Sequence, residues 1–280
     1  MHSQGSPAIA GTTLGWRTQS LWDFHFSARV FITVKFLLLV LLLIPASLRA
    51  DPLSDLRTTL QKLQSDQLLR ARVEIKSRRT GGENNKQKQS QGMSTVIVES
   101  GPEGLKLEWS PEQIKQSRKA AWEETANPDA PRSDIATLRA LEAGQALNLL
   151  DAADPLRRIL EKAVLREDKR ESYQGKPARL LVFHIELGLD EEERKALKSS
   201  DAYLKLWLDS DGIPMAMERD VQAKFSKFFV GYRAHEHDVR EYQRAGGRLV
   251  SIRTTRDSSG SGLGHTDEVH TTINVTLLTD

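Results

Sequence analysis

Hydrophobic and polar positions alternate along much of the chain after residue 69, and this pattern predicts strands with one buried face. Ala71, Val73 and Ile75 are separated by charged residues, and the same alternation runs through residues 202–208. Because the later strands follow one another without helices between them, we expect an antiparallel meander. The full set of expected strands covers residues 71–76, 94–98, 105–109, 178–186, 202–208, 213–221, 225–232, 239–244, 248–256 and 269–278.

Helical spacing of apolar residues is concentrated in two parts of the chain. Leucines from Leu53 to Leu68 predict an amphipathic helix over residues 51–69 that begins near Asp51. A capping-box sequence, Ser110-Pro-Glu-Gln113, predicts the start of another helix. Further helices are expected from Ile135 to Leu149 and from Asp154 onward, and residues 190–198 are expected to form a short surface helix or a charged loop. We expect the helix that begins at Ser110, the helix over residues 135–149 and the helix that begins at Asp154 to form a layer inserted between strands.

Three polar segments are predicted to be turns or loops. Residues 80–92 contain no apolar side chain and predict a long hairpin loop. The glycine-rich residues 258–264 predict a second loop. Residues 209–212 begin like a calcium-binding loop, but Gly212 arrives one position early, so we expect a hairpin turn there.

The longest apolar run, residues 36–44, follows Lys35 and precedes Pro45. Nine residues at 1.5 Å each are too short to cross a hydrocarbon core of about 30 Å. The run is typical of a secretory signal peptide. We expect residues 1–50 to be an N-terminal extension with a signal peptide cleaved after Ala50, and residues 51–280 to form one domain. An uncleaved anchor is the alternative.

Composition narrows the classes of function. The chain has 40 basic and 38 acidic residues, but four of the basic residues and one acidic residue precede residue 51. The remaining part is close to neutral, which argues against a general electrostatic grip on nucleic acid or anionic membrane. No cysteine is present, which excludes disulfides, a thiolate nucleophile and a lipid anchor attached through cysteine.

His235 and His237 are the strongest metal candidates, because residues two apart on a strand share a face. A third ligand would come from a neighbouring strand, for example His265 or His270. A solvated strand face explains the same residues, and we expect no metal or other cofactor. No combination of nucleophile, base and orienting group is apparent in the sequence, so we do not expect an enzyme.

Apolar side chains offer a different kind of site. Methionine and aromatic residues line adaptable hydrophobic cavities, although they also form ordinary cores. The candidate cavity residues are Trp109, Leu204, Leu206, Met215, Met217 and Phe228.

Two motifs resemble the LolA/LppX/RseB-like superfamily of bacterial envelope proteins. One is Tyr173-Gln-Gly-Lys-Pro-Ala-Arg-Leu-Leu-Val-Phe183, and the other is Tyr203-Leu-Lys-Leu-Trp-Leu-Asp209 followed by Gly212-Ile-Pro214. The resemblance implies an α+β fold in which a strongly curved antiparallel sheet, an unclosed β-barrel, has helices covering its concave face. It also implies an apolar cavity for acyl chains or a lipidated protein. The absence of cysteine excludes the membrane-anchored receptor form of this fold.

The leading hypothesis is an exported, periplasmic lipid- or lipoprotein-binding protein of the carrier type, soluble and without a lipid anchor. It would have no membrane-spanning segment after signal cleavage and would bind no nucleic acid. The alternative is an envelope interaction or sensor module with a filled core, whose partner binds the strand edges or the 80–90 segment. A metal-dependent enzyme around His235 and His237 is a third hypothesis.

Overall fold

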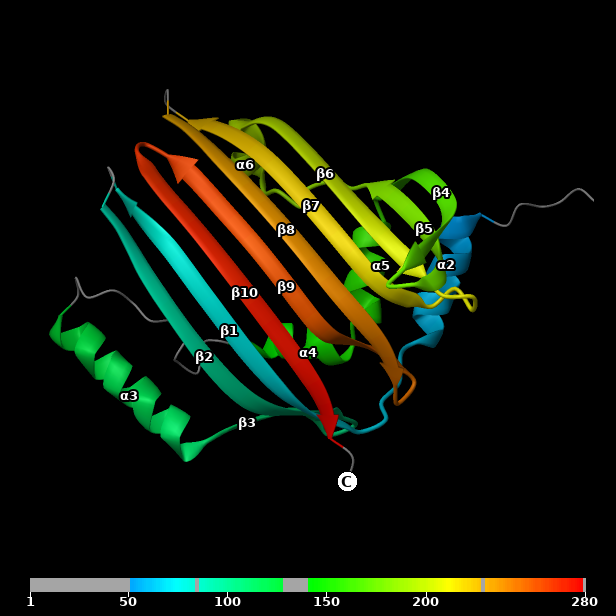
Figure 1. The fold of residues 1–280 in the computed structure, drawn as a ribbon, viewed down its shortest axis with the longest axis horizontal. Coiled ribbons are helices and arrows are strands. Elements are labelled where there is room, and N and C mark those ends of the chain that lie inside the picture. The colour runs from blue at the N-terminus through cyan, green and yellow to red at the C-terminus, as the bar shows by residue number, and fades with distance from the viewer. Residues whose placement is uncertain (1–50, 84–85, 128–140, 228–229, 279–280) are drawn as a thin grey trace, which may run out of the picture. The chain divides into compact units, whose positions relative to one another are not determined.

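A ten-stranded antiparallel sheet forms the centre of the computed structural model (Figure 1). The structure describes residues 51–83, 86–127, 141–227 and 230–278. Residues 50–280 form one compact unit. The expected signal peptide, the cleavage position and Phe228 lie outside the described residues.

The strands lie in the order β3-β2-β1-β10-β9-β8-β7-β6-β5-β4. Every described pair of neighbours is antiparallel. Their bounds are β1 Leu69–Glu83, β2 Lys86–Gly101, β3 Gly104–Trp109, β4 Val164–Tyr173, β5 Lys176–His184, β6 Leu197–Leu208, β7 Pro214–Lys227, β8 Val230–Ala245, β9 Arg248–Gly262 and β10 His265–Leu278.

The described helices are α2 Pro52–Lys62, α3 Pro111–Ala126, α4 Ala143–Leu150, α5 Ala153–Leu160 and α6 Glu191–Ala196. The α2 helix begins where the sequence predicts, with the Asp51 side chain accepting a hydrogen bond from the Leu53 backbone N–H at 3.1 Å. Ser110 caps α3 by accepting from the Gln113 N–H at 3.2 Å. Within the described residues, no helix is long and apolar enough to span a bilayer.

Helices α2 and α5 pack on the sheet face that we call the inner face. Leu56, Leu60 and Leu156 from these helices are buried against Phe183 and Leu204 of β5 and β6. Arg57 of α2 also donates to the Leu160 carbonyl oxygen at 2.7 Å, so it satisfies an unpaired acceptor at the end of α5. The two helices therefore cover the β5–β7 part of the inner face as one unit.

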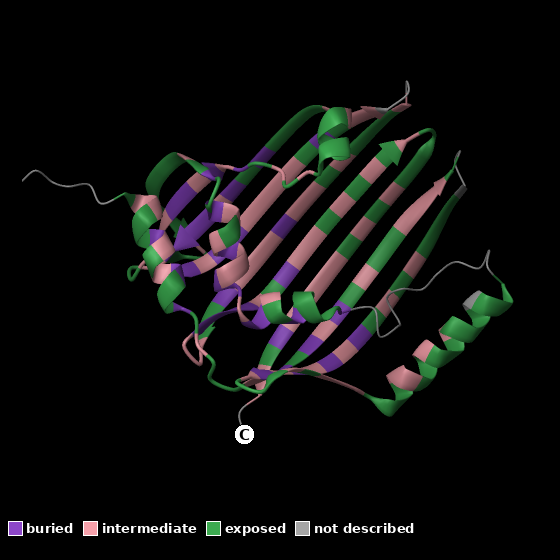
Figure 2. Cartoon of the chain, turned by 180° about the vertical axis from the view of Figure 1, so that it is seen from behind, coloured by how far each residue is buried: buried purple, intermediate pink, exposed green. Residues whose placement is uncertain are grey.

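Helix α4 covers a second part of the inner face. Its Leu149 and Leu150 pack with Val73, Val98 and Val275, from β1, β2 and β10. Each of these burials removes an aliphatic side chain from water, which stabilises the fold by about 1.5–3 kcal/mol per side chain. Figure 2 shows that buried positions gather near the helices, while intermediate and exposed positions dominate the far ends of β1, β2, β9 and β10.

The fold prediction is confirmed: the chain is an α+β protein with an open, curved antiparallel sheet and helices on one face. The helices cover only part of that face, however. None of the described side chains of α3 is buried, and this helix directly follows β3 in the sequence (Figure 1).

The predicted strand limits are wrong in several places. Residues 80–83 and 86–92 continue β1 and β2 in regular pairing, so these parts of the predicted long loop are strand. Residues 258–262 continue β9, and only residues 263–264 separate it from β10. The predicted strands 213–221, 225–232 and 239–244 are two long strands, β7 and β8, and β4 was not predicted.

Two helix predictions also need correction. Helix α2 ends at Lys62, not residue 69, and Leu68 is exposed just before β1. Of the predicted helix from Ile135 to Leu149, residues 135–140 lie outside the described residues, residues 141–142 are not helical, and residues 143–149 belong to α4. The expected helices at residue 154 and at residues 190–198 correspond to α5 and α6.

Candidate functional site

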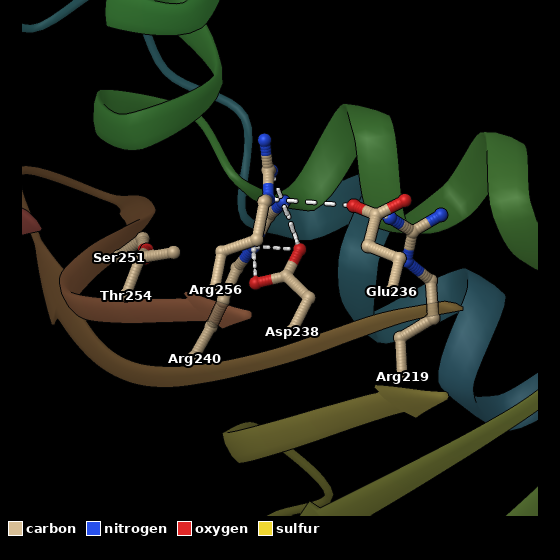
Figure 3. Close-up of polar contacts among 7 residues, drawn as sticks. All are labelled: Arg219, Glu236, Asp238, Arg240, Ser251, Thr254 and Arg256. Atoms are coloured by element: carbon tan, nitrogen blue, oxygen red, sulfur yellow. Dashed lines mark hydrogen bonds and ion pairs between the residues drawn. The ribbon is translucent and has the colours of Figure 1, made fainter. Parts of the chain in front are cut away.

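Beyond the helices, the inner face of the sheet changes from apolar to charged. Met217 of β7 is buried in the core, and Arg219 follows two positions later on the same face. Arg219 lies opposite Asp238 of β8, and Asp238 lies opposite Arg256 of β9. Together with Glu236 and Arg240, these side chains form the arginine cluster (Figure 3).

Asp238 is the centre of the arginine cluster and its side chain is fully buried. Arg240 approaches it through Nη2 at 2.7 Å and Nε at 3.2 Å, and Arg256 Nη2 lies 3.4 Å away. Burial by itself would raise the pKa of Asp238, but the charge and hydrogen bonds of Arg240 and the charge of Arg256 outweigh it and lower the pKa. Asp238 is therefore held as a buried anion.

Glu236 contacts two arginines of the cluster, Arg219 and Arg256. One of its oxygens lies 2.5 Å from Arg219 Nη2 and 3.4 Å from Arg256 Nε. The cluster thus has three guanidinium groups and two carboxylates, a net positive charge. The Arg256 side chain is 40% exposed, more than any other member. Arg256 is consequently the member best placed to meet a ligand.

A β-bulge adjoins the arginine cluster. The register of β8 and β9 shifts between Glu241 and Tyr242, which leaves Ile252 as the extra residue. The hydroxyl oxygens of Ser251 and Thr254 lie 3.1 Å apart, both buried (Figure 3). The two buried hydroxyls thus find a hydrogen-bond partner within the protein, as buried polar groups usually do.

An open hollow of about 370 Å³ lies on the other side of the cluster. Arg219 and Glu236 line its polar end. Its apolar lining comes from β7, β8 and the segment before α6: Leu187, Leu189, Val221, Ala223, Phe225, Tyr232 and Ala234. The volume falls within the range of small-molecule sites. The apolar strip therefore borders the arginine cluster through Arg219 and Glu236, and Glu236 lies 3.4 Å from Arg256. Asp267 is a second carboxylate in the lining.

The apolar residues predicted to line a cavity occupy other places. Leu204, Leu206 and Met217 are buried in the core beneath α2 and α5. Trp109 is partly buried near α4, and Met215 packs in a small cluster with Trp207. None of these residues lines the hollow.

The predicted metal candidates lie on the outer face, opposite the helices. His235 Nε2 is 2.8 Å and His237 Nδ1 is 3.5 Å from the same oxygen of Asp220. His265 is remote from them and pairs with Glu83 instead. Within the described ranges, no three such side chains are arranged to hold a metal ion.

One outer-face group has the order of a catalytic triad. Asp257 Oδ1 lies 2.6 Å from His270 Nδ1, and His270 Nε2 lies 3.4 Å from the Thr272 hydroxyl. Asp257 and His270 are exposed and Thr272 is partly buried, on strands β9 and β10, whose backbone N–H groups pair with neighbouring strands. The strands therefore present no free amides here for an oxyanion, and the group offers no basis for assigning catalysis.

Sequence reasoning missed the arginine cluster because charged residues on a strand are usually solvated. The available signal was the strand phase: Arg219 shares the face of Met217, which was expected to point inward. Only the cross-strand register places Asp238 and Arg256 beside it.

Comparisons with known proteins leave the family open. No family model matches the chain, and no curated protein matches it. Among solved structures, MucB in complex with MucA(peri) is similar at 8% identity and a TM-score of 0.19, over 80% of this chain and 93% of MucB. TldE from Thermococcus kodakarensis is similar at 15% identity and a TM-score of 0.13, over 75% of this chain and 43% of TldE. Likenesses at these TM-scores identify neither family nor function.

Proposed function

We propose that residues 51–280 bind an acyl chain, carried by a lipid or a lipidated protein, on the inner face of the sheet. The observation that carries this proposal is that the apolar hollow borders the arginine cluster at Arg219 and Glu236. We further propose that residues 1–50 export the chain to a periplasm, where it acts as a carrier without a membrane anchor.

The two ends of the hollow suit the two ends of such a ligand. Val221, Phe225 and Leu187 would cover methylene groups, each worth about 0.8 kcal/mol when buried. Arg256 would face an acidic head group or phosphate, because a guanidinium pairs well with both. The ligand would thus lie along β7 and β8, outside the filled core under α2 and α5.

Binding is tested by lipid extraction with mass spectrometry and by titration with a fluorescent long-chain fatty acid. We expect co-purified lipid or saturable probe binding. Val221→Asp places a charge in the hollow and should weaken probe binding at least about tenfold, since an unpaired charge resists burial. The matched control is Gln222→Asp, which puts the same charge on the opposite face and should leave affinity within about twofold.

The head-group part of the proposal has its own pair of variants. Arg256→Gln should weaken binding of the fatty acid more than binding of the corresponding uncharged alcohol. Arg233→Gln removes an arginine from the exposed outer face and serves as its control. A lipid-free protein that binds neither probe would favour the filled-core interaction module and reject the carrier function.

A further inference from the structure

Strand β2 has a long unpaired edge. It pairs with β1 along its whole length, from Lys86 opposite Glu83 to Ser100 opposite Leu69. On its other side, β3 pairs only with Val96–Gly101. No described strand pairs with residues 86–95 on that side. We call these residues the free edge.

The free edge is accessible. Gln87, Lys88, Gln89 and Gln91 are exposed and Met93 is 61% exposed, whereas Ser94 is buried. The contact of α3 with β2, between Gln113 and Ser94, lies at one end of this stretch. Peptide N–H and C=O groups along such an edge are a template for another strand.

The opposite edge of the sheet is protected against this kind of pairing. Its strand, β4, carries dense mixed charge from Arg166 to Glu171, and its pairing with β5 is interrupted by a bulge after Leu165. Charges and bulges on edge strands prevent addition of further strands. Residues 89–95 of β2 instead have no charged side chain, no proline and no interruption in their pairing with β1.

Basic side chains beside the free edge determine which kind of peptide segment it would bind. On the outer face, Lys76 lies opposite Met93 and Arg78 lies opposite Gln91. His270 extends the Arg78 row on the far side. These rows border a hollow of about 680 Å³ between β10, β1 and the edge. Asp257 lies in the Arg78 row beyond His270, to which it is bonded at 2.6 Å, and Glu74 and Glu268 lie one row away on either side.

On the inner face, the middle of the free edge carries small residues. Ser90 and Gly92 lie opposite Arg79 and Ser77, and both are only partly exposed. An added strand would place alternate side chains over these small residues, where large apolar groups fit. Its other side chains would point to the outer face, beside the Lys76 and Arg78 rows.

We propose that the free edge of β2 binds an extended acidic polypeptide segment by strand addition. The preferred segment alternates acidic and bulky apolar residues, with the acidic ones beside Lys76 and Arg78. Main-chain hydrogen bonds provide the attachment and the alternate side chains provide selectivity. The proposal concerns a different surface from the acyl-chain site and does not rest on it.

The test uses the full chain and a blocked peptide with a central Glu-Val-Glu-Val-Glu segment, with binding measured by fluorescence anisotropy. A peptide with Lys in place of Glu should bind at least about tenfold more weakly. Two further peptides carry backbone N-methyl groups on one or the other alternate set of residues. Only one alternate set of N–H groups faces the edge. One methylated peptide should therefore lose binding and the other should keep it.

Charge-reversal variants test the location. The double variant Lys76→Glu, Arg78→Glu should bind the acidic peptide at least about tenfold more weakly. The matched control is Lys224→Glu, Arg233→Glu, two residues that lie opposite each other on the same outer face, away from the edge. The control should bind within about twofold of the unchanged chain.

Three outcomes would overturn the proposal. Equal binding of both methylated peptides would show attraction by charge alone. Full binding by the Lys76→Glu, Arg78→Glu variant would place the peptide elsewhere. Absence of peptide binding together with a dimer in sedimentation would show that a second copy of the chain occupies the edge.

Discussion

Asp238 is the residue on which the charges of the inner face converge. Its carboxylate is fully buried between Arg240 and Arg256, and the β8–β9 pairing fixes its position. Replacing one partner of a buried pair leaves the others uncompensated, which costs more than the pair itself contributes.

We therefore expect Asp238→Asn to lower the free energy of unfolding by about 3 kcal/mol, measured by chemical denaturation. Asp257→Asn removes a carboxylate from the exposed outer face, where its side chain is 54% accessible. That control should cost less than about 1 kcal/mol. Equal losses in the two variants would contradict a special role for the arginine cluster.

Acid should weaken the same cluster. The pKa of Asp238 is below its ordinary value of 3.8, because Arg240 and Arg256 outweigh the effect of burial. A carboxylate with a lowered folded-state pKa stabilises the protein above its unfolded-state pKa, and the contribution disappears as pH falls through the folded-state pKa. The difference in unfolding free energy between the unchanged chain and Asp238→Asn should thus be constant above about pH 5 and shrink below about pH 4. A difference that stays constant down to pH 2.5 would contradict this assignment.

For single residues, the sequence predicts which face of a strand a side chain occupies better than it predicts what that side chain does. The alternation over residues 202–208 correctly places Leu204 and Leu206 inside. The same two-residue period places His235 and His237 on one face of β8, where both approach Asp220. The arginine cluster escaped prediction because its members come from three strands, and their register depends on the length of each hairpin.

At the scale of elements, strand length is the main difference between expectation and structure. Residues 80–92 and 258–262 look like loops because they are polar and rich in glycine. Their described residues form strands because the neighbouring strands pair along their length: β1 and β10 pair over fourteen residue positions, from Arg70 opposite Leu278 to Glu83 opposite His265, and residues 258–262 pair with both β10 and β8. Backbone pairing with neighbouring strands overrides local composition, which a single sequence does not reveal.

Turns were predictable because they impose conformations that few residues adopt. Gly212 has φ of +75°, and the Asp209 side chain accepts hydrogen bonds from the N–H groups of Asp211 and Ile213, each at 2.9 Å. This arrangement confirms the hairpin turn that the sequence predicts between β6 and β7.

The same substitution should have opposite effects in two elements. Gly212→Ala forces a side chain into the left-handed region and should lower the unfolding free energy by about 1 kcal/mol. Gly144→Ala lies in helix α4 with open space around the added methyl group. It should raise the unfolding free energy by about 0.5 kcal/mol, because alanine loses less backbone entropy in a helix. Thermal denaturation of both variants checks the two signs, and a stabilised Gly212→Ala would contradict the turn assignment.

At the scale of the whole described unit, the sheet has a covered part and an open part. Val73 and Val98 are buried against α4, whereas Gln87 and Gln89 on the same hairpin are exposed. Both parts have paired backbones, so they differ mainly in side-chain packing. This difference follows from the helices, whose approximate positions the sequence predicts but whose limited coverage it does not.

Hydrogen exchange should separate these two parts. We expect amides of residues 79–83 and 87–91 to exchange at least about tenfold faster than amides of residues 71–75 and 96–98, because few buried contacts oppose their local opening. Mass spectrometry of peptides from the two ends of the β1–β2 hairpin measures this ratio. Uniform protection along the hairpin would mean that the sheet opens only as a whole.

The position of β10 has a consequence for how the protein is made. The last described strand lies between β1 and β9, so among the described strands it is the one that pairs with both (Figure 1). During synthesis, β1 is made long before β10, its partner in the sheet. Contacts between residues so distant in sequence form slowly. The edge of β1 in a nascent chain therefore stays unpaired until β10 has been made. A chaperone that covers this edge would affect the folding rate and not the final structure.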